Sequence, residues 1–137
     1  MQINTQAAEA IIAGAEAKAR EMGLPVIIAV LDAGGHLKAF QRMDGAVLGS
    51  IDIAIRKAKT AVLFQCDSEA VWDYCKPGAP AHALELTNGG LAPFGGGLPL
   101  RTSDGAFIGA LGVSGGAVSQ DVEVAQAALA AFQALTL

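Results

Sequence analysis

Two histidines and one arginine are the side chains of this sequence best suited to ligand or proton chemistry. The chain holds only two histidines, His36 beside a glycine pair and His82 in the run PGAPAHALEL. A neutral imidazole serves as a metal ligand or as a general base near pH 7. We expect His82 to be the better candidate for either role, because a histidine in a turn is usually solvated. The alternative for His82 is a structural histidine that bonds to backbone.

Arg42 and Asp44 stand close together in the run RMDGA. A guanidinium binds a carboxylate through two parallel hydrogen bonds, so Arg42 predicts a site for an anionic ligand. Asp44 is then placed to move a proton or to activate water beside that ligand. The alternative is that Arg42 pairs with Asp44 or Asp52 and only holds the loop.

Two glycine-rich stretches lie in the last third of the chain. Gly95, Gly96 and Gly97 would let a flat ligand or a diacid lie against the backbone, because no Cβ blocks the approach. A β-bulge that eases sheet curvature is the alternative.

The second stretch, GVSGG at residues 112–116, satisfies the G-x-S-x-G pattern of a hydrolase nucleophile elbow. Such hydrolases place the histidine after the nucleophile, whereas both histidines here precede Ser114. No dinucleotide or P-loop fingerprint is present either. These glycines are better explained by the close approach of a strand and a helix, although amides at Gly115 and Gly116 would also suit a carboxylate.

Periodicity along the chain predicts the elements that position these residues. Helical stripes cover residues 5–22, a helix starting near residue 50, and a final helix opened by Ser119 and Asp121. Short helical pieces are expected at residues 68–74 and 79–86. Strands are expected in the runs VIIAVL, HLKAFQR, LAPF, LPLRT and AFIGALGV. Because the strands form hairpins, we predict one α+β domain over residues 1–137, an antiparallel sheet flanked by helices.

Composition narrows the classes of partner. Apolar residues make up 53% and charged residues 16% of the 137 residues, well below the usual charged share of about 25%. We therefore expect identical chains to cover apolar surface by assembling. A net charge of −4 without a basic stripe disfavours nucleic acid. The strongest apolar run, residues 26–31, is too short to span a membrane, and the start does not resemble a signal peptide, so a cytoplasmic location is expected.

Several separated motifs resemble one known family. They are VLDAGGHLKAFQRMDGA, RKAKTA, FGGGLPL and DGAFIGALGVSGGAVSQDVEVAQAA. Together they resemble the GlcG/HbpS-like haem-binding, or haem-degrading, family. The PGAPAHALEL and FGGGLPL segments look closest to the C-terminal domain of the propanediol-utilisation corrinoid adenosyltransferase. The resemblance implies a five-stranded antiparallel sheet between helices, and assembly into a homotetramer or homo-octamer.

The resemblance implies two functions, which the sequence leaves open. In the first, the oligomer binds haem or a related anionic molecule near subunit contacts. Arg42 and the glycines Gly95, Gly96 and Gly97 would hold the ligand, with His82 or His36 as the metal ligand. In the second, the protein is a cofactor-independent hydrolytic dehalogenase or tautomerase of muconate-type diacids. Arg42 would then clamp a carboxylate, while His82 or Asp44 performs the acid–base chemistry.

Overall fold

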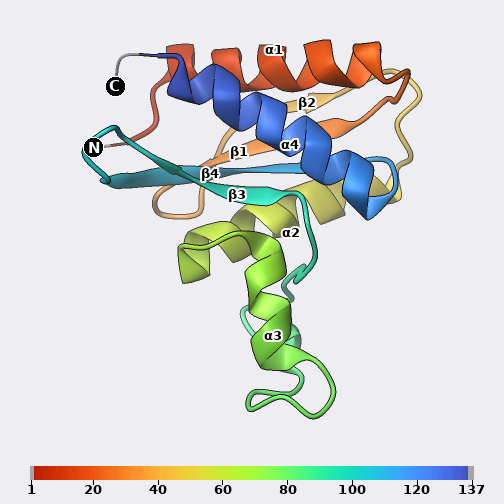
Figure 1. Cartoon of the computed structure of the whole chain (residues 1–137), viewed down its shortest axis with the longest axis vertical. Coiled ribbons are helices and arrows are strands. Elements are labelled where there is room, and N and C mark those ends of the chain that lie inside the picture. Colours follow the sequence, from red (N-terminus) through yellow and green to blue (C-terminus); the bar gives the residue numbers. More distant parts are fainter. Residues whose placement is uncertain (1, 136–137) are drawn as a thin grey trace.

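A four-stranded antiparallel sheet in the order β2-β1-β4-β3 forms the centre of the fold (Figure 1). The structure is a computed structural model that describes residues 2–135. Its strands are β1 (Ile27–Asp32), β2 (Leu37–Arg42), β3 (Gly97–Arg101) and β4 (Phe107–Ser114). β1 and β4 occupy the middle of the sheet, so the two edges are β2 and β3.

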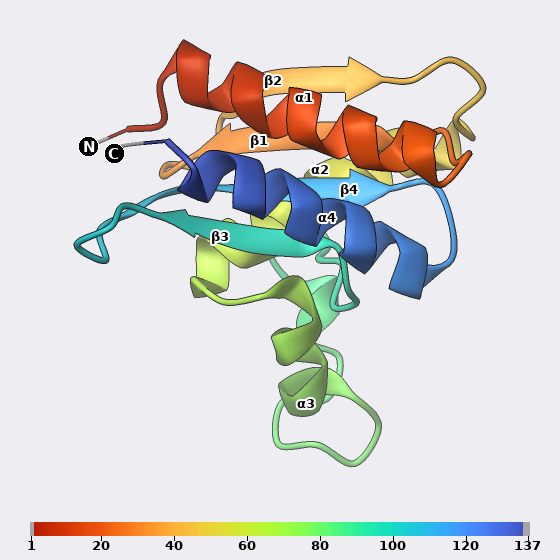
Figure 2. The ribbon, with the colours of Figure 1, turned by 45° about the horizontal axis from the view of Figure 1, so that its top comes forward.

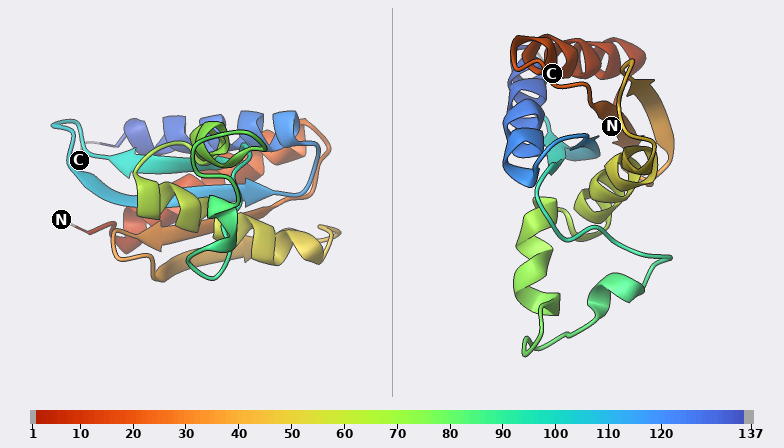
Figure 3. Two further views of the ribbon diagram at one scale, coloured as in Figure 1. Left: turned by 90° about the horizontal axis from the view of Figure 1, so that it is seen from below. Right: turned by 90° about the vertical axis from the view of Figure 1, so that its right-hand side faces the viewer.

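Helices cover both faces of this sheet (Figure 3). α1 (Thr5–Glu21) and α4 (Val118–Gln133) pack together on one face, and α2 (Gly49–Phe64) packs on the other. The Asn4 side chain caps α1 by accepting a hydrogen bond from the Ala7 amide at 2.8 Å, as that residue type favours. The helix thus follows the predicted range closely, and the α+β prediction is confirmed.

Both faces of β1 are buried, which explains why the run VIIAVL is apolar throughout and does not alternate between apolar and polar residues. Ile28 and Val30 pack into the core beneath α1 and α4, whereas Ile27 and Ala29 pack against Ala54 of α2. A strand covered by helices on both faces has no solvent face to reserve for polar side chains. The apolar sequence of this one strand therefore indicates that helices cover both faces of the sheet.

Residues 91–94 do not form the expected fifth strand, so the prediction that LAPF forms a strand was wrong. Residues 91–94 are irregular, with their polar groups bonded outside any ladder. The amide of Ala92 donates to the hydroxyl of Thr60 at 3.0 Å, and the carbonyl of Phe94 accepts from the hydroxyl of Ser68 at 2.6 Å. Pro93 has no amide hydrogen to give to a neighbouring strand.

Residues 65–96, which we call the arm, project from the sheet beyond α2 (Figure 2). The arm holds a 3-10 turn (Ser68–Val71), the short helix α3 (Trp72–Cys75) and a second 3-10 turn (Leu84–Leu86). Polar side chains of α2 fasten its return: Arg56 donates to the carbonyls of Gly89 and Gly90, and Lys59 to that of Asn88. The helical piece expected at residues 79–86 is limited to the 3-10 turn at its last three residues.

No helix within residues 2–135 is both long and apolar enough to cross a bilayer.

Candidate functional site

Arg42 ends β2 and is exposed to solvent together with Asp44. Both line a polar cavity of about 300 Å³ beside the C-terminal part of α1. Across residues 2–135, Arg42 forms no ion pair with Asp44 or Asp52, and Asp52 instead pairs with Arg56 at 2.6 Å. The Arg42 guanidinium is therefore open to an external anion, and the loop-holding alternative does not occur in this chain.

His36 lies in the turn between β1 and β2, as expected, and its side chain is exposed. Its Nδ1 lies 3.2 Å from Oδ1 of Asp32, which also accepts from the amides of Gly34 and His36 at 2.9 and 3.0 Å. These bonds, chiefly from the His36 amide, lower the pKa of Asp32. A carboxylate at Nδ1 orients an imidazole and leaves Nε2 free for another partner.

His82 lies in the arm, between α3 and the turn at Leu84–Leu86, and it is exposed. Arg42 and Asp44 lie instead beside α1, in the cavity described above, which His82 does not line. Arg42 and Asp44 share a cavity, but His82 lies outside it. One chain therefore provides no common site for the form of the dehalogenase or tautomerase hypothesis in which His82 performs the acid–base chemistry.

Gly95, Gly96 and Gly97 are buried, and the space beside them is filled by the protein itself. A Cβ at Gly95 would overlap Val122, and one at Gly97 would overlap the backbone of Lys57. At Gly96, with φ of +126°, a Cβ would lie 2.8 Å from Nζ of Lys57. Because these glycines have no side chains, α2 and α4 can pack closely against the start of β3. A role for them in ligand binding stays a prediction.

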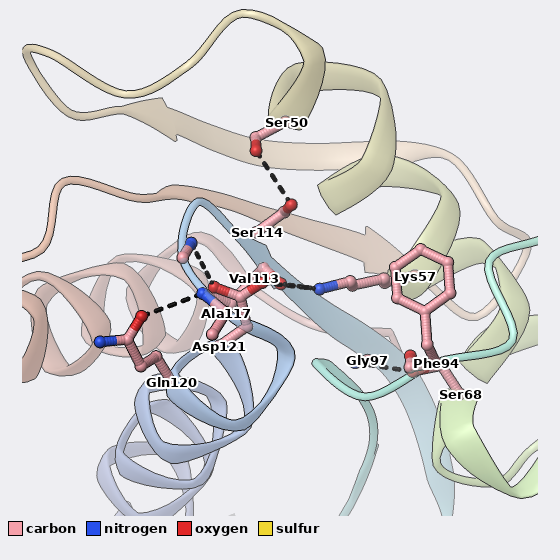
Figure 4. A network of polar contacts seen from close by, with 11 residues as sticks. Ser50, Lys57, Ser68, Phe94, Gly97, Val113, Ser114, Ala117, Gln120 and Asp121 are labelled. Carbon is pink, nitrogen blue, oxygen red and sulfur yellow. Dashed lines mark hydrogen bonds and ion pairs between the residues drawn. The ribbon is translucent and has the colours of Figure 1, made fainter.

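Lys57 of α2 is a charged residue in the interior of the molecule. It is fully buried, and its Nζ lies 3.0 Å from Oδ2 of Asp121 and 2.8 Å from the carbonyl of Val113 (Figure 4). Asp121 also accepts from the amide of Gly116 at 2.9 Å. Burial lowers the pKa of Lys57, and the neighbouring carboxylate opposes that shift.

Ser114 does not form a nucleophile elbow. Its hydroxyl is buried and lies 3.1 Å from the hydroxyl of Ser50, with both imidazoles exposed elsewhere. A Cβ at Gly112 would overlap the carbonyl of Ala54, so this glycine lets α2 lie directly on β4. The close-approach interpretation of the stretch is confirmed.

Comparison with known proteins decides the family. A family model described as haem degrading protein HbpS-like matches residues 3–130. The chain belongs to this HbpS-like family. The resemblance inferred from the motifs is therefore confirmed.

Three HbpS-like relatives show how far the similarity extends. An uncharacterized 15.0 kDa protein in the dhaT-dhaS intergenic region of Citrobacter freundii is 42% identical, over 97% of this chain and 94% of its own. The crystal structure of Klebsiella pneumoniae protein ORFY has a TM-score of 0.94 at 40% identity, covering 98% of this chain and 94% of that one. The crystal structure of a PduOC:heme complex has a TM-score of 0.89 at 35% identity, covering 96% and 95%.

Within this HbpS-like chain, the arm encloses an apolar cleft of about 430 Å³. Its lining includes Phe64, Cys66, Tyr74, Ala81 and Leu84. Burial raises the pKa of the Cys66 thiol, so this sulfur is protonated at neutral pH. His82 follows Ala81 directly, which makes this the apolar cleft nearest in sequence to a predicted metal ligand.

Proposed function

We propose that this protein binds haem, or a related flat molecule that carries carboxylates, as an assembly of identical chains. The proposal is carried by the match to PduOC in its complex with haem, at a TM-score of 0.89 over 96% of this chain. A shared fold alone does not transfer a function. The proposal therefore also depends on whether this chain's own residues suit the group.

The arm cleft suits the macrocycle. Its lining is almost entirely apolar, and Tyr74 adds a phenol at its edge. An imidazole is the commonest axial ligand of haem iron, and His82 carries one next to this cleft. The protonated thiol of Cys66 is a poor ligand by comparison. A bound haem supplies an iron centre that binds small molecules and transfers electrons.

Arg42 is the proposed partner of the propionates. Because its cavity lies beside α1 and not in the arm, Arg42 would contact a haem held by a neighbouring chain. This division of the site between chains agrees with the expectation of pockets near subunit contacts. His36 offers the second imidazole, oriented by Asp32, and is the competing candidate for the iron.

Assembly of identical chains is part of the proposal. Leu86 is 78% exposed and Leu48 is 70% exposed, and several other large apolar side chains are also exposed. Monomeric proteins seldom leave large contiguous apolar surface in water. We propose a homotetramer or homo-octamer, and sedimentation velocity measures which of them forms.

A hemin titration with matched variants tests the function. We expect a Soret band that saturates near one haem per chain, a strongly reduced band in His82→Ala, and an unchanged band in His36→Ala. Arg42→Ala should weaken binding by about tenfold, the scale of a lost charge-assisted pair. The opposite result for the two histidines would move the iron to His36. Uptake that does not saturate and ignores all three variants would show only apolar adsorption.

A further inference from the structure

A second cleft, of about 630 Å³, lies where the arm meets the first turn of α4. Its walls are formed by Trp72, Pro93, Phe94 and Val118, together with the acidic residues Glu69 and Asp73. Neither histidine lines it, and neither does Arg42. Of the described residues that line it, Ala70 alone also lines the arm cleft, so it is a separate cleft that neighbours the haem site proposed above.

Two aromatic side chains in this cleft remain partly open to water. Trp72 is 44% exposed and Phe94 is 39% exposed, although most aromatic side chains bury their surface. The Phe94 segment is held in place, since its carbonyl accepts from Ser68 and Gly95 has no room for a side chain beside Val122. The aromatic wall is thus preformed.

The acidic side chains give the cleft its charge. Within residues 2–135 the Glu69 carboxylate has no ion pair or hydrogen bond. Its Oε2 lies against the floor, 3.5 Å from where a Cβ of Gly95 would be. Asp73 shares its charge with Lys76, whose Nζ lies 3.7 Å away. The negative charge of Glu69 is therefore the one in this cleft that no described cation neutralises, and it is available to a ligand.

Positive charge near the cleft is already balanced. Lys57 lies behind Phe94, with Nζ 5.2 Å from the ring centroid, but it is buried and paired with Asp121 at 3.0 Å. The N-terminal turn of α4 adds a partial positive charge of about half an elementary charge, which is smaller than the full negative charge of the Glu69 carboxylate. Among the described residues, no lysine, arginine or histidine lines the cleft. Its net field is negative.

We propose that this cleft binds a small organic cation with an apolar body, of the quaternary ammonium or arylalkylamine class. The face of an indole attracts such cations through its ring quadrupole. Trp72 would receive the cationic head, with the Glu69 carboxylate nearby and Phe94, Pro93 and Val118 against the apolar body. An anion would meet Glu69 and Asp73 and be repelled, whereas a neutral molecule would gain only the apolar contact.

The chain carries its own probe for this cleft, because Trp72 is its single tryptophan. Tryptophan emission is recorded while the full-length protein is titrated with benzyltrimethylammonium chloride. Benzyl alcohol serves as the neutral comparison and sodium benzoate as the anionic one. We expect a saturable change with the cation, at least about tenfold weaker binding of the alcohol, and no binding of benzoate.

Charge variants locate the binding. Glu69→Gln should weaken binding of the cation by about three- to tenfold, and Asp73→Asn by less, because Lys76 already shares its charge. Glu9→Gln, which removes an exposed carboxylate on α1, is the matched control and should leave the affinity unchanged. Circular dichroism establishes that each variant is folded.

Three results would overturn the proposal: no saturable change in emission, binding of benzoate as tight as that of the cation, or indifference to Glu69→Gln in a folded protein. Failure of the haem proposal is read separately, from the Soret band. Hemin should bind equally well in the presence of saturating benzyltrimethylammonium, and mutual displacement would disprove the separation of the two sites.

Discussion

The ion pair between Lys57 and Asp121 is only partly predictable from the sequence. Lys57 follows Ala54 by three residues and precedes Ala61 by four, and both alanines are buried. Helical spacing therefore does place Lys57 on the covered face of α2. Its partner, however, lies 64 residues further along the chain. Nothing local in the sequence indicates that pairing, because only the tertiary fold brings the two elements together.

Removing this lysine is expected to destabilise the protein strongly. In Lys57→Met the Asp121 carboxylate stays buried without its counter-charge, which costs about 3–5 kcal/mol. Urea unfolding at pH 7 measures the loss. The matched control is Lys18→Met on α1, where the ion pairs with Glu21 and Glu123 are exposed and the cost should stay below about 1 kcal/mol.

Adding Asp121→Asn to Lys57→Met should restore part of the lost unfolding free energy, because the unpaired charge is then gone. If Lys57→Met and Lys18→Met lowered the free energy of unfolding equally, this would contradict the burial of the Lys57–Asp121 pair in the structure.

At the scale of elements, periodicity and capping residues predicted the three long helices and the two central strands well. Residues 91–94 show where this reasoning fails. Their apolar composition suits a strand, but Pro93 and the hydroxyl groups of Thr60 and Ser68 direct the backbone bonds elsewhere. Those hydroxyls come from α2 and the arm, so the competition is tertiary and cannot be read from a local run of residues.

The contact between α2 and β4 should depend on the missing side chain at Gly112. In Gly112→Ala the new methyl group would overlap the Ala54 carbonyl and lie 2.7 Å from the amide nitrogen of Ala58. Both atoms are helix backbone, so α2 must shift, at a cost of about 3 kcal/mol or more.

Gly49→Ala is the control for this substitution. Gly49 is the first residue of α2, and nothing lies within 4 Å of the position that its Cβ would take. Its unfolding free energy, measured in urea, should stay within about 0.5 kcal/mol of the parent protein. A small effect at both glycines would mean that α2 packs less tightly on the sheet.

For the whole molecule, the arm is the feature that sequence reasoning did not anticipate. His82 and Arg42 were placed in one hypothetical site, but the arm carries His82 away from β2, where Arg42 ends the strand. The length of an irregular stretch does not reveal whether it folds back or projects. The composition leads to a separate prediction, that so weakly charged a chain associates with copies of itself, and this stays a prediction.

We expect the arm to mediate assembly. Leu86→Lys puts a charge on its most exposed apolar side chain and should raise the concentration at which oligomers dissociate by at least about tenfold, measured by sedimentation velocity. Leu37→Lys, which is exposed on the edge strand β2, tests the alternative contact and should have little effect. A parent protein that remains monomeric, or Leu86→Lys oligomers of undiminished stability, would refute this role.

The Lys57–Asp121 pair also joins α2 and α4, which lie on opposite faces of the sheet. If either helical layer detached while the other stayed in place, one charge would be stranded in an apolar setting. A half-open intermediate is therefore costly, and loosening of one layer must be accompanied by loosening of the other. Amide hydrogens in the middle of the two helices should accordingly exchange with solvent in a single cooperative event.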